Sequence, residues 1–151
     1  MGDRLKDKIA IIVGAGQSPG PTPAIGNGRA TAILFAREGA KVLAVDRHLD
    51  AAQATVDLIL EEGGEAAAHA ADVTIESDME GMVTACTDRW GRVDVLHNNV
   101  GISVEGGDAP VTEITTEAFD KIINVNLRSM VYACKHALPI MRKQQSGAII
   151  N

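Results

Sequence analysis

Residues 8–46 read KIAIIVGAGQSPGPTPAIGNGRATAILFAREGAKVLAVD, and this stretch decides the fold. The apolar run Ile9–Val13 stops at a glycine, as expected of a strand buried on both faces of a sheet. A glycine- and proline-rich turn follows, and from Arg29 the apolar residues recur at helical spacing until Gly39. Lys41–Val45 is a second buried strand. A strand, a helix and a further strand in this order predict a parallel βαβ unit.

Short apolar runs and longer helical patterns keep alternating along the rest of the chain. Such repeats form parallel sheets with helices on both faces. We therefore predict the α/β class: a doubly wound parallel sheet in a Rossmann-like, three-layer α/β/α arrangement, truncated in its fifth strand, with residues 1–151 as a single domain. Three further helices are expected: one capped by Asp50, one that starts at Thr74 or Ser77, and one from Thr116 to Arg142. Three further strands are expected over 65–71, 93–97 and 148–151.

The last of these helices is predicted to be one long element. Pro139 is expected to break or kink its last turn, because proline lacks the N–H that a helix needs, and Gly147 is expected to end the element. An apolar stripe is expected to face inward, made of Phe119, Ile122, Ile123, Met130, Val131, Cys134 and Leu138.

Composition and charge exclude several classes of function. The chain has 14 Lys and Arg against 20 Asp and Glu, a net charge of −6, which argues against nucleic acid as a partner. No apolar stretch approaches the ~20 residues of a membrane-spanning helix, and the charged N-terminus lacks the apolar segment of a signal peptide. We therefore expect a cytoplasmic protein without membrane contact. Cys86 and Cys134 are expected to be buried. The histidines lie on separate elements, so no metal site is predicted: His48, His69, His97 and His136.

The turn after the first strand has the composition of a phosphate site. Gly14 and Gly16 open the turn, and Gly26-Asn27-Gly28 stands directly before the helix. Glycine lets a phosphate approach the free N–H groups at the positive end of a helix. The first glycines depart from the spacing G-x-G-x-x-G, so a connector without a ligand remains the alternative.

Asp46 strengthens the prediction of a nucleotide site. It ends the second strand a little under ~20 residues after the last glycine, where a carboxylate binds the adenosine ribose. A carboxylate accepts hydrogen bonds from both ribose hydroxyls and repels a 2′-phosphate. This favours NAD over NADP, although the neighbouring Arg47 acts in the opposite direction. The alternative is a solvated aspartate in a loop.

Together these residues resemble the short-chain dehydrogenase/reductase family of NAD(P)-dependent oxidoreductases. The resemblance covers Lys8 to Asn151. The glycines from Gly14 to Gly28 are similar to the family turn Gly-x-x-x-Gly-x-Gly, with an insertion after the first glycine. Asn98-Asn99-Val100-Gly101 is similar to the Asn-Asn-Ala-Gly motif that follows the fourth strand, with valine in place of alanine.

The resemblance implies roles for further residues. Asp72 and Val73 would contact the adenine ring, and Asn99, Val100 and Gly101 would line the cofactor site. Asn126 would be the active-site asparagine, whose side chain helps to hold a distortion of the long helix and a water of the proton relay. The alternative for Asn126 is an ordinary polar residue on a helix.

The sequence also departs from the family. The catalytic serine and the Tyr-x-x-x-Lys pair of the family lie beyond Asn151, and Tyr132 is followed four residues later by His136 instead of lysine. The resemblance thus implies the cofactor-binding half of an NAD-dependent oxidoreductase, inactive alone, whose complete form would act on a small-molecule alcohol or carbonyl substrate. The alternative is a non-catalytic dinucleotide-binding or interaction module. A homo-oligomer is a further expectation.

Overall fold

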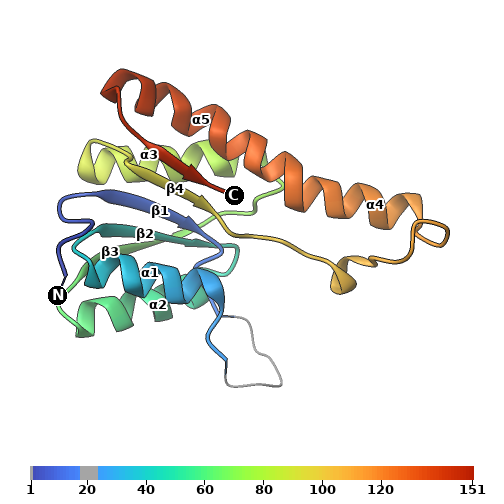
Figure 1. The fold of residues 1–151 in the computed structure, drawn as a ribbon, viewed down its shortest axis with the longest axis horizontal. Helices are drawn as coiled ribbons and strands as arrows, with labels where there is room; N and C mark the ends of the chain where they lie inside the picture. Colours follow the sequence, from blue (N-terminus) through green and yellow to red (C-terminus); the bar gives the residue numbers. More distant parts are fainter. Residues whose placement is uncertain (1, 18–23) are drawn as a thin grey trace.

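The described part of the chain folds around one parallel sheet of five strands in the order β3-β2-β1-β4-β5 (Figure 1). The structure is a computed structural model that describes residues 2–17 and 24–151. The doubly wound parallel sheet predicted from the sequence is confirmed. Its strands are β1 (Ile9–Val13), β2 (Lys41–Asp46), β3 (Glu65–Ala70), β4 (Val95–Asn98) and β5 (Ala148–Ile150).

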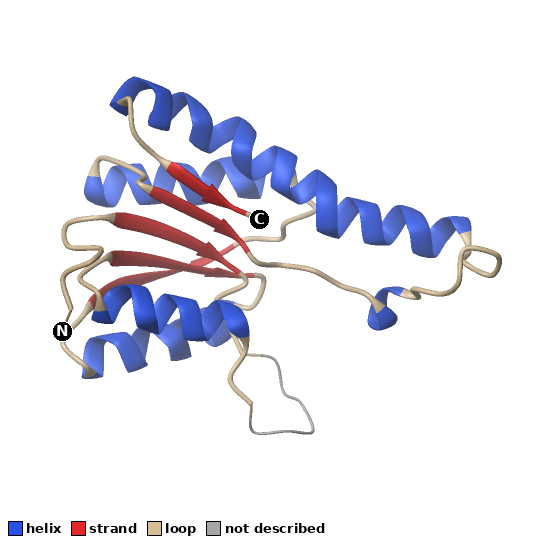
Figure 2. Cartoon of the chain, in the orientation of Figure 1, coloured by secondary structure: helices blue, strands red, loops and turns tan. Residues whose placement is uncertain are grey.

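Helices cover both faces of the sheet (Figure 2). One face carries α1 (Asn27–Arg37) and α2 (Leu49–Glu61), and the other carries α3 (Glu76–Trp90) and α5 (Ser129–Gln144), which is preceded by α4 (Thr116–Ile123). β1 is buried along its whole length because its alternate side chains serve both layers. Ile11 packs toward α3 and α5, and Ile12 packs toward α1 and α2.

The long helix is distorted in its middle, where the family resemblance implies a distortion at Asn126, and this changes the inward face predicted from periodicity. A π-helical turn, η2 (Asn124–Arg128), joins α4 to α5, and the Ser129 N–H bonds the Asn124 carbonyl five residues earlier. The extra residue in this turn rotates everything that follows by about a quarter turn. Val131 and Leu138, predicted to face inward, follow this turn and are exposed, Val131 to 56%. Phe119, also predicted to face inward, lies before the turn in α4 and is 52% exposed. The buried face of α5 is made of Ser129, Ala133, Ala137 and Met141.

The predicted break at Pro139 is wrong, since α5 continues to Gln144. Proline removes a hydrogen bond to the carbonyl of Lys135. Both residues are exposed, so water can satisfy that carbonyl and the helix persists. Gln145 ends the helix in the left-handed conformation, with φ of 55°, and not Gly147 as predicted.

Two helix starts also differ from the prediction. α2 begins at Leu49 with His48 as its N-cap, while Asp50 lies inside the first turn. α3 follows Ile75, because the hydroxyl and N–H of Thr74 are used by the Asp72 carboxylate. In the described ranges, no helix is long and apolar enough to cross a membrane.

Candidate functional site

A cavity of about 760 Å³ opens at the carboxyl ends of β1, β2 and β4, where open α/β sheets bind their ligands. Its size is in the range of small-molecule and cofactor sites. Eight of the residues singled out from the sequence line it, and Asn126 follows two further lining residues, Asn124 and Val125. The eight are Gly14, Gly16, Asp46, Asp72, Val73, Asn99, Val100 and Gly101.

The turn Gly14–Gly16 is held in place by protein acceptors and donors. The N–H groups of Gly14 and Ala15 both donate to the Val45 carbonyl, at 2.8 and 2.9 Å. The Gly16 N–H donates to the Asp46 carboxylate at 3.1 Å, and the Gly14 carbonyl accepts from the Asn99 side chain at 3.2 Å. The N–H groups of this turn are therefore already used, and a phosphate needs other donors.

The start of α1 supplies such donors. Gly26 is the N-cap, offers no side-chain cap, and no acidic residue occupies the first turn. The first three N–H groups of a helix have no partner inside it, and here those of Asn27, Gly28 and Arg29 bond no acceptor in the described residues. Uncapped N–H groups at the positive end of a helix form an anion site.

The glycines of the turn differ in why a larger residue would or would not fit at each position. A Cβ on Gly28 would lie 1.9 Å from the Gly14 carbonyl oxygen, so this glycine lets α1 pack on the turn. Gly14 has φ of +78°, and a Cβ there would also meet Val100 at 2.8 Å. By contrast, the nearest atom to a Cβ on Gly26 would be 3.5 Å away. Among the described residues, the space beside Gly26 is therefore open.

Gln17 was missed by the reasoning from sequence. Its side chain accepts from the Gly26 N–H at 2.7 Å and donates to the Ala24 carbonyl at 3.1 Å. It thus joins the two ends of the predicted insertion, of which residues 18–23 lie outside the described residues. No sequence motif predicts this contact, because it depends on where the residues after the insertion lie relative to Gln17.

The two aspartates lie on the β2 and β3 side of the cavity. The Asp46 carboxylate accepts from the N–H groups of Gly16 and His48, each at 3.1 Å. A hydrogen bond from the Thr74 hydroxyl, assisted by the Thr74 N–H, lowers the pKa of Asp72 despite partial burial. Asp72 is therefore ionised at neutral pH. Arg47 also lines the cavity, and its Nε donates to His48 Nε2 at 3.0 Å.

Asn126 lies in the π-helical turn and fastens the loop that follows β4. Its Nδ2 donates to the Ile102 carbonyl and its Oδ1 accepts from the Ile102 N–H, both at 2.8 Å. The side chain therefore links the helix distortion to the end of the Asn99–Gly101 segment. Tyr132 instead packs against the core between the sheet and α3.

The cysteines and histidines form no second centre in the described residues. Burial raises the pKa of the Cys86 thiol to about 12, so this sulfur is not a nucleophile at neutral pH. No group of three or more His, Cys, Asp or Glu side chains in residues 2–17 and 24–151 is arranged to hold a metal ion.

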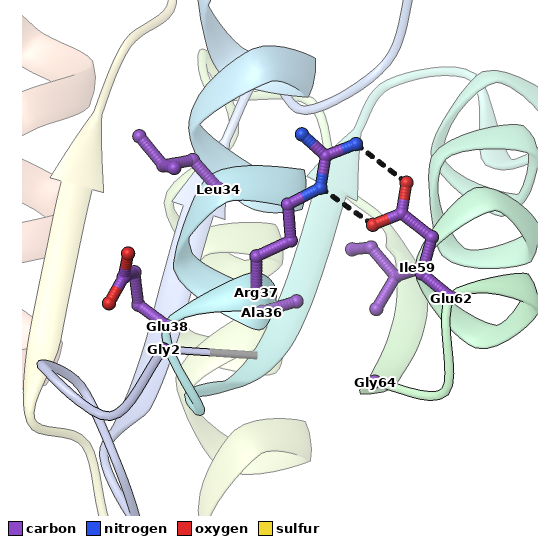
Figure 3. A pocket seen from close by; sticks show the side chains of 8 residues that line it. All are labelled: Gly2, Leu34, Ala36, Arg37, Glu38, Ile59, Glu62 and Gly64. Carbon is purple, nitrogen blue, oxygen red and sulfur yellow. Dashed lines mark hydrogen bonds and ion pairs between the residues drawn. The ribbon is translucent and has the colours of Figure 1, made fainter.

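A smaller hollow of about 340 Å³ lies between the C-terminal ends of α1 and α2 (Figure 3). Arg37 and Glu62 span it with two hydrogen bonds of 2.6 Å, and Glu38 is paired with Arg4 at 2.8 Å. Its charges are thus neutralised within the protein. It also lies at the opposite edge of the sheet from the carboxyl ends, so it is not the ligand site expected of this fold.

A parallel sheet with a glycine turn, an uncapped helix start and a carboxylate after the second strand is the arrangement of dinucleotide-binding α/β proteins. Residues 8–151 match the family described as short chain dehydrogenase, and the chain belongs to this family. It is 38% identical to levodione reductase of Leifsonia aquatica over 98% of this chain and 52% of that protein. It is 33% identical to cyclohexanol dehydrogenase of Acinetobacter sp. (strain SE19) over 100% of this chain and 56% of that protein.

Solved structures of the family are similar in fold and carry either cofactor. A 7α-hydroxysteroid dehydrogenase complexed with NADH and 7-oxo glycochenodeoxycholic acid has a TM-score of 0.85 and 34% identity, over 97% of this chain and 52% of that one. A metagenomic short-chain oxidoreductase in complex with NADP has a TM-score of 0.84 and 28% identity, over 97% and 62%. The chain thus spans about half the length of the curated relatives, and these structures show no preference between the cofactors.

Proposed function

We propose that this chain is the cofactor-binding half of an NAD-dependent oxidoreductase that moves hydride between a nicotinamide and an alcohol or carbonyl carbon. The observation that carries the proposal is the uncapped start of α1. The helix begins against Gly14 and Asn99, both of which line the large cavity. The proposed ligand therefore has an anion site directly beside a cavity of suitable size.

Each part of NAD fits a group of residues in this cavity. The N–H groups of Asn27, Gly28 and Arg29 would hold the pyrophosphate, and the open space at Gly26 admits it. Asp46 would accept from the adenosine ribose, and the adenine ring would lie by Asp72 and Val73. The nicotinamide end would lie along Asn99, Val100 and Gly101. When bound, NAD supplies a carbon that accepts or returns hydride.

The preference for NAD over NADP rests on charge. The Asp46 carboxylate is fixed by two backbone N–H groups, so it cannot turn away from a 2′-phosphate without losing both bonds. Arg47 is a cation that lines the cavity, and its Nε is already used by His48. Like charges in contact disfavour the wrong ligand.

Asn126 is proposed as a positioning residue of this site. Its amide groups are bonded to Ile102, so it acts by fixing the loop after Asn99–Gly101 against the π-helical turn. In the whole protein the same distortion would serve the proton relay that the family resemblance implies. The substrate of that protein, a small alcohol or carbonyl compound, is part of the proposal, and so is a cytoplasmic location, supported by two unpaired cysteines.

Isothermal titration calorimetry of the chain with NAD, NADP and ADP-ribose tests the proposal. We expect NAD and ADP-ribose to bind and NADP to bind more weakly. ADP-ribose lacks the nicotinamide, so similar affinities for it and NAD would place most of the binding at the adenosine and pyrophosphate. Failure of all three to bind would refute the nucleotide site, while equal binding of NAD and NADP would refute the preference alone.

A second candidate function, an interaction module, is favoured by one specific observation. Phe119, Leu127 and Val131 are all more than half exposed and follow one another along α4, η2 and α5 at spacings of eight and four residues. Such a stripe fits a partner helix or a second copy of the chain. Light scattering distinguishes the cases, because a monomer at high concentration would count against a homo-oligomer.

A further inference from the structure

Thr55 is a fully buried polar residue in the middle of α2, with 0% of its surface exposed. Its hydroxyl donates to the Ala15 carbonyl at 2.7 Å and accepts from Arg29 Nε at 2.9 Å. One side chain therefore connects α2 to the glycine turn and to the first turn of α1. We propose that Thr55 is a positioning residue for the pyrophosphate site, an inference that rests on the function proposed above.

The direction of the hydroxyl is unusual for a threonine inside a helix. Such a hydroxyl commonly bonds the carbonyl four residues earlier, which is that of Ala51. Here the Ala51 carbonyl is 3.4 Å from the hydroxyl oxygen, and Arg29 Nη2 approaches the same carbonyl at 3.4 Å. The single hydroxyl proton goes to the nearer acceptor, Ala15. Arg29 thus occupies the other side of the hydroxyl and competes for the alternative acceptor.

The Ala15 carbonyl depends on Thr55 because Ala15 is itself completely buried. The N–H groups of Gly14 and Ala15 bond β2, the Gly16 N–H bonds Asp46, and the Gly14 carbonyl bonds Asn99. The Ala15 carbonyl bonds Thr55. A buried carbonyl without a donor is unfavourable, so without the hydroxyl the turn would shift toward water. Since Gly28 packs directly on the Gly14 carbonyl, a shift of the turn moves the N–H groups at the start of α1 relative to Asp46.

The variant Thr55→Val tests this role, because valine keeps the shape and removes the hydroxyl. We expect the dissociation constants for NAD and ADP-ribose to rise about tenfold, which corresponds to about 1.4 kcal/mol. Thr55→Ser restores the hydroxyl and should bind within about twofold of the parent chain. Thr87→Val is the matched control, since the Thr87 hydroxyl bonds the Thr84 carbonyl on the exposed side of α3, away from the cavity. All titrations are made well below the melting temperature of each variant.

If Thr55 had only a structural role, Thr55→Val would lower the melting temperature and leave the affinity for NAD unchanged. That result would overturn the inference. Amide hydrogen exchange of the free chain gives a readout without NAD. Exchange at Gly16 should become faster in Thr55→Val and stay slow in Thr87→Val, and unchanged exchange would also overturn it. If the parent chain does not bind NAD, the proposed function fails, while the exchange of Gly16 still decides whether Thr55 fixes the turn.

Arg29→Met provides a second variant if Thr55→Val does not fold. Methionine keeps the unbranched apolar part of the side chain but cannot donate to the Thr55 hydroxyl, which is then free to turn to the Ala51 carbonyl. We expect the affinity for NAD to fall severalfold and exchange at Gly16 to become faster. An Arg29→Met chain that matches the parent in both measurements would overturn the inference.

Discussion

The variant Gly26→Val separates binding of the cofactor from folding. Gly26 has φ of −66° and ψ of 148°, which are ordinary extended values for any residue. No atom of the described chain lies within 3.5 Å of a Cβ placed there. The fold should therefore tolerate the valine, at the cost of about 1 kcal/mol expected for an unfavourable N-cap.

The same side chain would stand in front of the N–H groups of Asn27 and Gly28, where the pyrophosphate is proposed to bind. A hydrogen bond to a charged group is worth about 1.5–3 kcal/mol, so loss of two such bonds weakens binding by at least about 100-fold. Calorimetric titration with NAD measures this loss, and circular dichroism checks the fold. Gly81→Val is the matched control, because a Cβ on Gly81 meets only His69, at 3.9 Å.

Two results would refute this reasoning. If Gly26→Val binds NAD like the parent chain, the start of α1 does not hold the pyrophosphate, and the turn is a connector. If Gly26→Val unfolds, the space at Gly26 is not open as described. Gly28→Ala gives the contrasting case. Its Cβ would lie 1.9 Å from the Gly14 carbonyl oxygen, so we expect that variant to lose the native fold.

Three further predictions concern cofactor choice, stability and loop order. Asp46→Ser removes the carboxylate, so the preference for NAD over NADP should fall at least about tenfold in parallel titrations; an unchanged ratio would contradict the role of Asp46. Burial alone would raise the pKa of Asp94, but hydrogen bonds from Arg92 and the Ile9 N–H outweigh it and hold that pKa below its ordinary value. The ionised Asp94 therefore stabilises the fold above its unfolded pKa of about 4, and this contribution is lost as the pH falls through the lower native pKa. In urea unfolding, Asp94→Asn should cost about 2 kcal/mol at pH 7 and progressively less below pH ~4, and a cost independent of pH would count against the ion pair. Asn126→Ala loses both bonds to Ile102, so amide exchange at Ile102 should become faster and stability should fall by about 2 kcal/mol; slow exchange would show that the loop is held by other contacts.

The strands were predictable because their sequences carry a local signal. Ile9–Val13 is apolar throughout, and the structure buries each of its residues because it is the central strand between β2 and β4. The sequence also marks where β1 and β2 end, at Gly14 and Asp46, while β4 ends at Asn98, one residue past its predicted end. Since the carboxyl ends of parallel strands meet at one edge of the sheet, most of the predicted site residues had to lie near one another.

The inward face of the last helix could not be predicted in the same way. A pattern with 3.6 residues per turn assumes an uninterrupted helix, whereas η2 adds one residue to a turn and changes the phase after Arg128. The apolar periodicity of Asn124–Arg128 does not differ from that of ordinary helix, and only the family resemblance at Asn126 implied a distortion here. The distortion is supported from outside, by the bonds between Asn126 and Ile102.

Side-chain contacts between residues far apart in the chain could not be predicted from the sequence either. Neither Thr55 nor Gln17 is a motif residue, and their partners, Ala15 and Gly26, are identified only after the chain has folded. Sequence periodicity indicates which residues are buried, but it does not show which buried carbonyl lacks a donor. The supporting contacts of the site therefore emerge from the structure alone.

The contact made by Gln17 has a practical consequence for protein engineering. Its side chain joins the Ala24 carbonyl and the Gly26 N–H, so described residues on the two sides of the predicted insertion are held close together. The entropic cost of closing a longer connection grows only slowly with its length. A reporter domain spliced between Gln17 and Ala24 would thus be anchored next to the start of α1, and its signal could be coupled to nucleotide occupancy.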